Sequence, residues 1–158
     1  MNRMMQISRV GWLAPLLLAA AAWAAGLNAP DQVKNSLRIL AYVQNDMASK
    51  LPNKRYEMLP HENQEFQEAA VPMLKSVAGE PAEFRARVET QLKKAQAAAN
   101  QVAEISKSGD AQRISAAVTA VDAALRPLYE LFPQELRPVP GQLGSGPGRR
   151  GGPPPDLR

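Results

Sequence analysis

The stretch Ile114–Phe132, ISAAVTAVDAALRPLYELF, carries the clearest pattern in the chain. Its apolar residues fall at positions 114, 118, 121, 125, 128 and 132, alternating steps of four and three residues. This spacing is typical of a helix packed against others, because residues three and four apart share one helical face. Pro127 lies inside the pattern, at a place where a helix loses a backbone hydrogen bond. We predict a packed helix that ends at Pro133.

Three further segments show helical periodicity. They extend from about residue 30 to 51, from 61 to 77 and from 81 to 107, and a loop with a proline at each end covers residues 52–60. No segment alternates apolar and polar residues with a period of two, so no strand is predicted. The fold class is therefore all-α.

Local signals refine these helices. In the second helix Leu74 falls among the residues predicted to face inward, and Pro72 should kink or split the helix. Gly79 is expected to cap its end, because glycine readily adopts the left-handed conformation found there. Asp110 is expected to cap the start of the fourth helix with its carboxylate.

Four helices joined by short links favour one arrangement, an antiparallel up-down-up-down four-helix bundle that buries all four apolar stripes together. The alternative is a pair of helical hairpins that need a partner to close.

The N-terminus predicts export. Arg3 and Arg9 precede the apolar run Val10–Ala25, and Ala22-Trp23-Ala24 offers a cleavage site of the A-x-A type. The alternative is a retained membrane anchor, but the run is shorter than the roughly 20 residues of a spanning helix. We therefore interpret residues 1–25 as a signal peptide, which predicts a periplasmic or secreted protein and membrane contact only if the leader is not cleaved.

Charge and composition divide the rest of the chain. The segment 26–137, expected to form the bundle, holds 14 basic and 14 acidic residues, so the net charge of +4 belongs to the two ends. A neutral body argues against nucleic acid as a partner. The segment 138–158 holds 6 of the 14 prolines and 6 of the 10 glycines, and a disordered tail is predicted there. Such a tail serves as a tether or docking segment, or has no role of its own.

Few residues carry the chemistry of a site. The chain has no cysteine and one histidine, His61. Glu65 stands four residues later, where a zinc-protease helix has its second histidine, so the two could hold a metal only weakly. Met47 and Met58 are soft potential ligands, although core packing is the more common use of methionine. Neighbouring carboxylates such as Glu62 and Glu65 are interpreted as a solvated helix face. No catalytic residue set can be nominated, and we predict a protein that is not an enzyme.

The helix-four phrase GDAQRISAAVTAVDAALRPLYELF resembles, in layout, the last helix of the cytochrome c-prime group, exported and alanine-rich four-helix bundles. In that family a glycine-aspartate cap leads into the haem motif C-x-x-C-H and an aromatic residue. The resemblance places the two cysteines at Ala124 and Pro127, the histidine at Leu128 and the aromatic at Tyr129 or Phe132. Covalent attachment and axial ligation are both absent, so the resemblance implies a haem-less member without a cofactor.

The related soluble b-type bundles hold haem without a covalent bond, through a methionine early in helix one and a histidine late in helix four. Here the histidine opens the second helix, at the opposite end, where it could meet Met47 instead. The resemblance therefore implies a binding or accessory protein for an unidentified envelope component. The alternative is a haem- or metal-binding protein that uses Met47, Met58 and His61. Pro127 is hypothesised to mark a bend at the position of the missing haem motif.

Overall fold

The computed structural model describes residues 26–139, and this part of the chain contains helices and no strand. The prediction of an all-α fold is confirmed. The elements are α2 (Pro30–Ser49), the 3₁₀ helix η1 (Tyr56–Met58), α3 (Leu59–Ser76), α4 (Ala82–Ser106), α5 (Ala111–Glu130) and the 3₁₀ helix η2 (Gln134–Leu136). The predicted signal peptide and all but two residues of the predicted tail lie outside the described residues. Within residues 26–139, none of the helices has the length and apolar character needed to cross a membrane.

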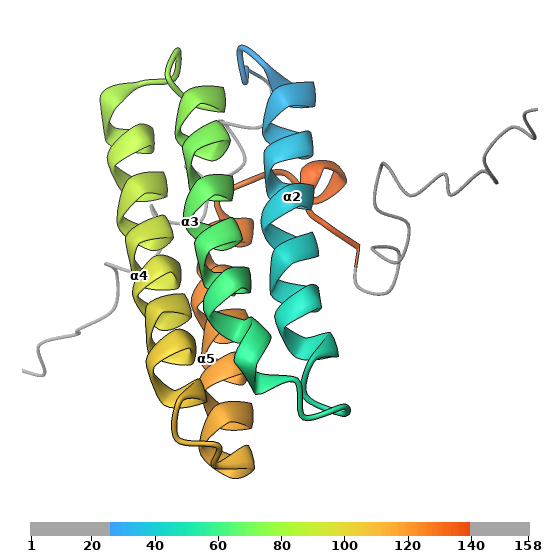
Figure 1. Ribbon diagram of the computed structural model, residues 1–158. Coiled ribbons are helices and arrows are strands. Elements are labelled where there is room, and N and C mark those ends of the chain that lie inside the picture. The colour runs from blue at the N-terminus through green and yellow to red at the C-terminus, as the bar shows by residue number, and fades with distance from the viewer. Residues whose placement is uncertain (1–25, 140–158) are drawn as a thin grey trace, which may run out of the picture.

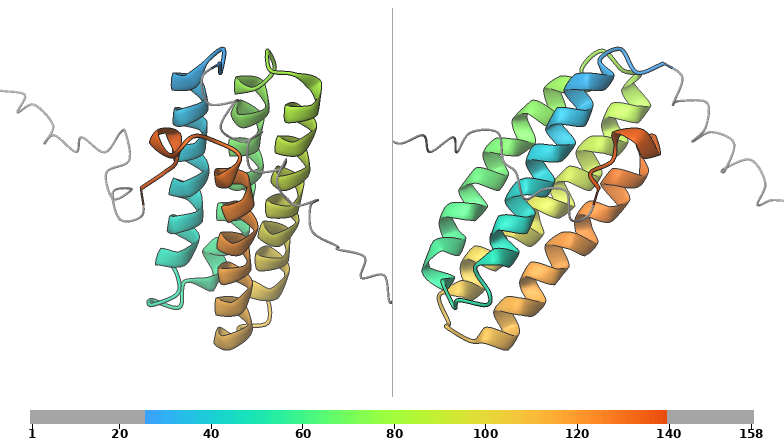
Figure 2. Two further views of the ribbon diagram at one scale, coloured as in Figure 1. Left: turned by 180° about the vertical axis from the view of Figure 1, so that it is seen from behind. Right: turned by 90° about the vertical axis from the view of Figure 1, so that its right-hand side faces the viewer.

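The four α-helices lie side by side, and each runs in the direction opposite to the one before it (Figure 1). Helix α3 packs between α2 and α4, and α5 packs mainly against α4. Contact between α2 and α5 is less extensive, and the segment with η2 folds back to cover α2 beside this seam (Figure 2). The seam is therefore closed partly by the chain that follows the last long helix.

One continuous apolar core runs along the four helices. It follows the stripes read from the sequence, because residues spaced three and four apart reach the same side of each helix. Phe84 and Phe132 meet edge to face with ring centroids 5.5 Å apart, near the end of the body where α4 begins. Each fully buried large aliphatic or aromatic side chain contributes about 1.5–3 kcal/mol through the hydrophobic effect. The largest of these are Leu37, Leu40, Met47, Leu59, Phe66, Met73, Leu92, Ile114, Leu125, Leu128 and Phe132.

The start of α5 confirms the predicted cap. The carboxylate of Asp110 accepts hydrogen bonds from the backbone amides of Gln112 (3.0 Å) and Arg113 (3.1 Å). Gly109 precedes it with a φ of 68°, a conformation that glycine adopts without a steric penalty. The turn between α4 and α5 is thus encoded by two adjacent residues.

Helix α3 differs from its prediction in three ways. It begins at Leu59, because Pro60 occupies the first turn, where its missing amide costs no hydrogen bond. It continues without a break through Pro72, so the prediction of a split is wrong. Pro72 and the residue four positions earlier, Glu68, are both exposed, and water can satisfy the carbonyl that Pro72 leaves unbonded. Leu74, predicted to face inward, is exposed.

The end of α3 is not capped by Gly79. The helix ends at Ser76 with Val77 as its cap residue, and Gly79 does not adopt a positive φ. Its carbonyl instead accepts a hydrogen bond from the side-chain amide of Asn28 at 2.9 Å. The backbone amide of Asn28 donates to the buried carboxylate of Glu80 at 2.7 Å. These bonds fasten the segment before α2 to the α3–α4 connection.

Helix α5 likewise continues through Pro127 to Glu130. Pro127 and Ala123, whose carbonyl would have accepted its amide, are both exposed. Leu125 and Leu128 on either side are fully buried. An unbroken helix with packed neighbours gives no support to the hypothesis that Pro127 marks a bend over a missing haem site.

The connection after α2 contains the one non-glycine residue with a positive φ among residues 26–139. Lys54 has a φ of 53°, and its amide donates to the carbonyl of Leu51 at 3.1 Å. The amide of Arg55 donates to the carbonyl of Lys50 at 3.0 Å. These two bonds form a Schellman turn, which normally has glycine at the left-handed position.

Candidate functional site

A buried carboxylate defines the most unusual polar site in the described chain. Glu62 lies in the first turns of α3, and only 2% of its surface is exposed. It occupies the inward stripe of the helix, between Leu59 and Phe66, so the fold of α3 carries it into the core. A buried carboxylate is costly unless a cation and hydrogen bonds compensate it.

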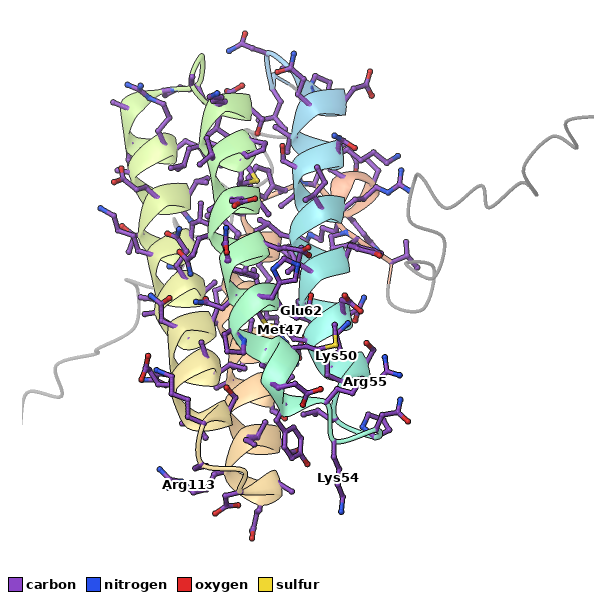
Figure 3. All side chains as sticks on the ribbon, viewed as in Figure 1. Met47, Lys50, Lys54, Arg55, Glu62 and Arg113 are labelled. Carbon is purple, nitrogen blue, oxygen red and sulfur yellow. The ribbon has the colours of Figure 1, made fainter. Side chains whose placement is uncertain are left out.

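Lys50 supplies that cation from the end of α2. Its Nζ atom lies 3.1 Å from Oε1 of Glu62 and 3.0 Å from Oδ1 of Asp46, one helical turn earlier on α2. The Lys50 side chain is itself only 11% exposed. One ammonium therefore bridges a carboxylate on each of two helices, and we call Asp46, Lys50 and Glu62 the ion cluster. Lys50 and Glu62 lie close together where α2 leads into α3 (Figure 3).

The ion cluster is incompletely satisfied. Oε2 of Glu62 is buried and has no hydrogen-bond partner among the described protein groups. Burial raises the pKa of Glu62, and the neighbouring Asp46 carboxylate acts in the same direction against the opposing effect of Lys50. The hydrogen bonds and charge of Lys50, with the Ser49 hydroxyl, hold the pKa of Asp46 below its ordinary value despite partial burial. The pKa of Lys50 is raised by its two carboxylate partners, which outweigh its desolvation.

The residues nominated from the sequence have different surroundings. Met47 is fully buried in the core, between Asp46 and Lys50 in the sequence of this segment. The His61 side chain is 64% exposed, and its Nε2 atom lies 3.2 Å from Oε1 of Glu65. His61 and Glu65 thus share a face, as predicted, and this face is turned to solvent. Met58 is half-buried in η1.

The buried sulfur of Met47 and the exposed ring of His61 lie in contrasting environments, which disfavours a shared axial-ligand site. Among residues 26–139, no group of three or more histidine, aspartate or glutamate side chains is arranged to hold a metal ion. The pairing of His61 with Glu65 is that of an ordinary surface contact between helix neighbours.

The positions that correspond to a haem motif are occupied by packing residues. Leu128, at the histidine position, is fully buried, whereas Pro127 is exposed and Ala124 is half-buried. The hydroxyl of Tyr129 is buried and has no hydrogen-bond partner among the described groups. Burial and the charge of Asp122 raise its pKa, so it stays protonated. Leu128 therefore belongs to the core and has no atom that can ligate a metal.

The interpretation of Glu62 as part of a solvated helix face is wrong. The sequence did contain a signal for its burial, because Leu59, Glu62, Phe66, Ala69 and Met73 follow one another at steps of three and four residues. Its charge and its position after His61 favoured the surface interpretation. Its cation, Lys50, is twelve residues away across a loop, and no local pattern pairs the two.

In comparisons with known proteins, no family model, no curated protein and no solved structure matches this chain. The functional assignment therefore depends on the residues and their geometry.

Proposed function

We propose that this chain is an exported, non-enzymatic protein that acts as a binding or accessory component for another protein of the bacterial envelope. In this proposal residues 1–25 are a signal peptide, residues 26–137 form an antiparallel up-down-up-down bundle, and residues 138–158 are a disordered tail. The bundle is a haem-less relative of the cytochrome c-prime group and functions in the periplasm or outside the cell.

The observation that carries this proposal is the packing of Leu128. Its side chain is fully buried between the stripes of α5 and the other helices, at the position where the cytochrome layout has its haem ligand. A leucine there contributes to folding stability and has no donor atom for iron. At this position the helix carries a buried apolar side chain, which supports a role as a scaffold.

The alternative function is haem or metal binding through Met47, Met58 and His61. Met47 and Met58 are less accessible than His61, and His61 already pairs with Glu65. Binding of one group by all three residues would require the end of α2 and the start of α3 to rearrange. The alternative therefore receives less support than the scaffold role.

Export and partner binding are tested together by expressing the full chain with a tag on its last residue. We expect the protein in the periplasmic or extracellular fraction, shortened near residue 25, and cross-linked there to one protein in comparable amount. A matched chain without residues 1–25 remains in the cytoplasm and serves as the control for non-specific capture. Recovery of the full chain in the cytoplasm, or of the same set of proteins with both chains, contradicts the proposal.

The cofactor alternative is tested on the purified protein by an absorbance scan, a haemin titration and metal analysis. We expect no Soret band and no stoichiometric metal. A strong Soret band, or a stoichiometric metal that is lost in the His61→Ala variant, contradicts the scaffold role and establishes the alternative. The Lys94→Ala variant, which changes an exposed side chain of α4, is the matched control.

A further inference from the structure

The ion cluster carries an unbalanced charge inside the protein. When all three groups are ionised, two carboxylates share one ammonium, which leaves one net negative charge. The unsatisfied hydrogen-bond acceptor of the cluster belongs to Glu62, because its Oε2 atom is buried without a partner while Oε1 contacts Lys50. The smallest species that satisfies both the charge and the free oxygen is a proton.

We propose that Glu62 is a proton-binding site whose occupancy controls how firmly the connection between α2 and α3, residues 50–58, is held. The argument requires neither export nor a partner, so it is independent of the function proposed above.

The step is a simple protonation. A proton from solvent adds to Oε2 of Glu62 and converts the carboxylate to a neutral acid. Lys50 keeps its ion pair with Asp46, which lies on the same helix, and loses its charged partner on α3. A cross-helix ion pair becomes a weaker interaction between a charge and a neutral group. The tie between the two helices at this end is therefore weakened.

The connection responds because Lys50 supports it through both side chain and backbone. The Lys50 carbonyl accepts the amide of Arg55 at 3.0 Å, which closes the Schellman turn. That turn holds Lys54 at a φ of 53°, a conformation that costs free energy for a residue with a side chain. A strained turn opens more readily when the residue at its base is less firmly held. Proton uptake therefore loosens the exposed segment that carries Lys54 and Arg55.

Other charged groups at this end do not take over the role of Lys50. Besides burial, the charged groups that affect the pKa of Glu62 are Lys50 and Asp46. The pKa of Glu62 is raised above its ordinary value, which favours proton uptake. His61 and Glu65, one and three positions away on α3, pair with each other at the surface. The remaining charged residues of the connection, η1, α4, the α4–α5 turn and α5 at this end are exposed: Lys54, Arg55, Glu57, Glu104, Lys107, Asp110 and Arg113.

Amide hydrogen exchange of the full chain tests the proposal. Protection of the Lys54 and Arg55 amides, corrected for intrinsic exchange, is measured by NMR between pH 7 and pH 4.5. In the wild type we expect protection to fall by about threefold across this range, a modest effect because Lys50 loses Glu62 but keeps its ion pair with Asp46. The Glu62→Gln variant, which imitates the neutral acid, should show the lower protection already at pH 7.

Two controls keep the test decisive. The Glu65→Gln variant removes an exposed carboxylate of the same helix and should leave the wild-type pH dependence unchanged. The carboxyl carbon of Glu62, followed by NMR in the wild type, should titrate above the ordinary glutamate value of about 4.3. Equal protection in the wild type and Glu62→Gln at every pH, or titration of Glu62 at or below its ordinary value, overturns the proposal.

Discussion

At the scale of single residues, the least common feature of the described chain is a buried carboxylate that is paired with a lysine. Glu62 lies in an apolar stripe and depends on one ammonium that it shares with Asp46. Buried ion pairs of this kind often fail to offset their desolvation, although breaking one partner alone is strongly destabilising. Removing the charge of Glu62 and removing the charge of Lys50 are therefore expected to change the free energy of unfolding in opposite directions.

Removing the charge of Glu62 should stabilise the whole fold at neutral pH, even though it loosens the connection of residues 50–58. Global unfolding transfers Glu62 to water, whereas opening of the connection leaves it buried and only moves Lys50 away. Because its pKa is higher in the folded state than in the unfolded chain, the ionised form opposes folding above that pKa. Stability is regained as the pH falls through this range. We expect Glu62→Gln to raise the free energy of unfolding by about 1 kcal/mol at pH 7, the scale of an unsatisfied buried polar atom. The gain should shrink toward pH 4.5 in urea denaturation experiments. The prediction is contradicted if the difference in unfolding free energy between Glu62→Gln and wild type is smaller at pH 7 than at pH 4.5.

Removing Lys50 should have the opposite effect. Lys50→Met leaves Asp46 and Glu62 without their shared cation, and one of the two carboxylates is buried. We expect a loss of about 2 kcal/mol at pH 7, less than for a fully buried pair because Asp46 has access to solvent. The loss should become smaller in acid, where Glu62 is protonated. Denaturation of Lys94→Met, which changes an exposed lysine of α4, provides the comparison, and an equal loss in both variants would rule out a special role for Lys50.

At the scale of elements, turns and prolines decide where each helix begins, ends and continues. Two connections use a left-handed residue: Gly109 before α5, and Lys54 after α2. Glycine adopts this conformation freely, whereas a residue with a Cβ atom pays a steric cost. Introducing glycine at position 54 and removing it at position 109 should therefore change the free energy of unfolding in opposite directions.

The exchange of these residue types tests that geometry. Lys54→Gly should raise the free energy of unfolding by about 0.5–1 kcal/mol, because it removes strain at the cost of some unfolded-state entropy. Gly109→Ala should lower it by about 1 kcal/mol, and the effect is pure backbone strain because a Cβ there meets no atom within 4 Å. Thermal denaturation followed by circular dichroism measures both. Shifts of the same sign would show that the left-handed turns do not set these stabilities.

Pro127 allows a second test at this scale. Pro127→Ala restores an amide that can donate to the carbonyl of Ala123, and both positions face solvent. Because α5 already continues through this residue, we expect the variant to be more stable by about 1 kcal/mol or more. If a bend at Pro127 were required for packing of Leu125 and Leu128, the variant would instead unfold at a lower temperature.

The sequence predicted the helices well because their stripes and caps are local. The spacing in Ile114–Phe132 and the carboxylate of Asp110 depend on residues within one or two turns of each other. The errors arose where the outcome depends on tertiary context. Whether Pro72 breaks a helix depends on which side of the helix faces water. Whether Glu62 is buried depends on Lys50, whose approach requires the fold of the intervening loop. The ion cluster could therefore not be predicted from local sequence patterns, although the apolar residues around Glu62 could.

At the scale of the whole molecule, an ion cluster stabilises one end of the helical body and hydrogen bonds stabilise the other. The ion cluster joins α2 and α3 where α2 leads into α3 (Figure 3). Asn28 joins the segment before α2 to Glu80 and Gly79. The start of α2 and the α3–α4 connection lie at the opposite end of the body (Figure 1). Between the two ends runs one continuous core. Among the contacts between neighbouring α-helices, the one between α2 and α5 is the least extensive. Separation into two hairpins, α2–α3 and α4–α5, would also have to break the extensive contact between α3 and α4.

A double-mutant cycle across the two ends distinguishes one cooperative body from two hairpins. Asn28→Ala removes the hydrogen bond to the Gly79 carbonyl and should cost about 1 kcal/mol. Glu62→Gln acts at the opposite end of the core. If α2–α5 unfold as one unit, each change shifts a single transition, and their effects add to within about 0.5 kcal/mol because the sites share no partner. Circular dichroism at 222 nm and tyrosine fluorescence should then give coincident urea transitions in all four proteins. Two transitions, of which both substitutions move only the one that reports α2 and α3, would mean that the helices pair as separate hairpins, and the continuous core would then depend on a partner for its stability.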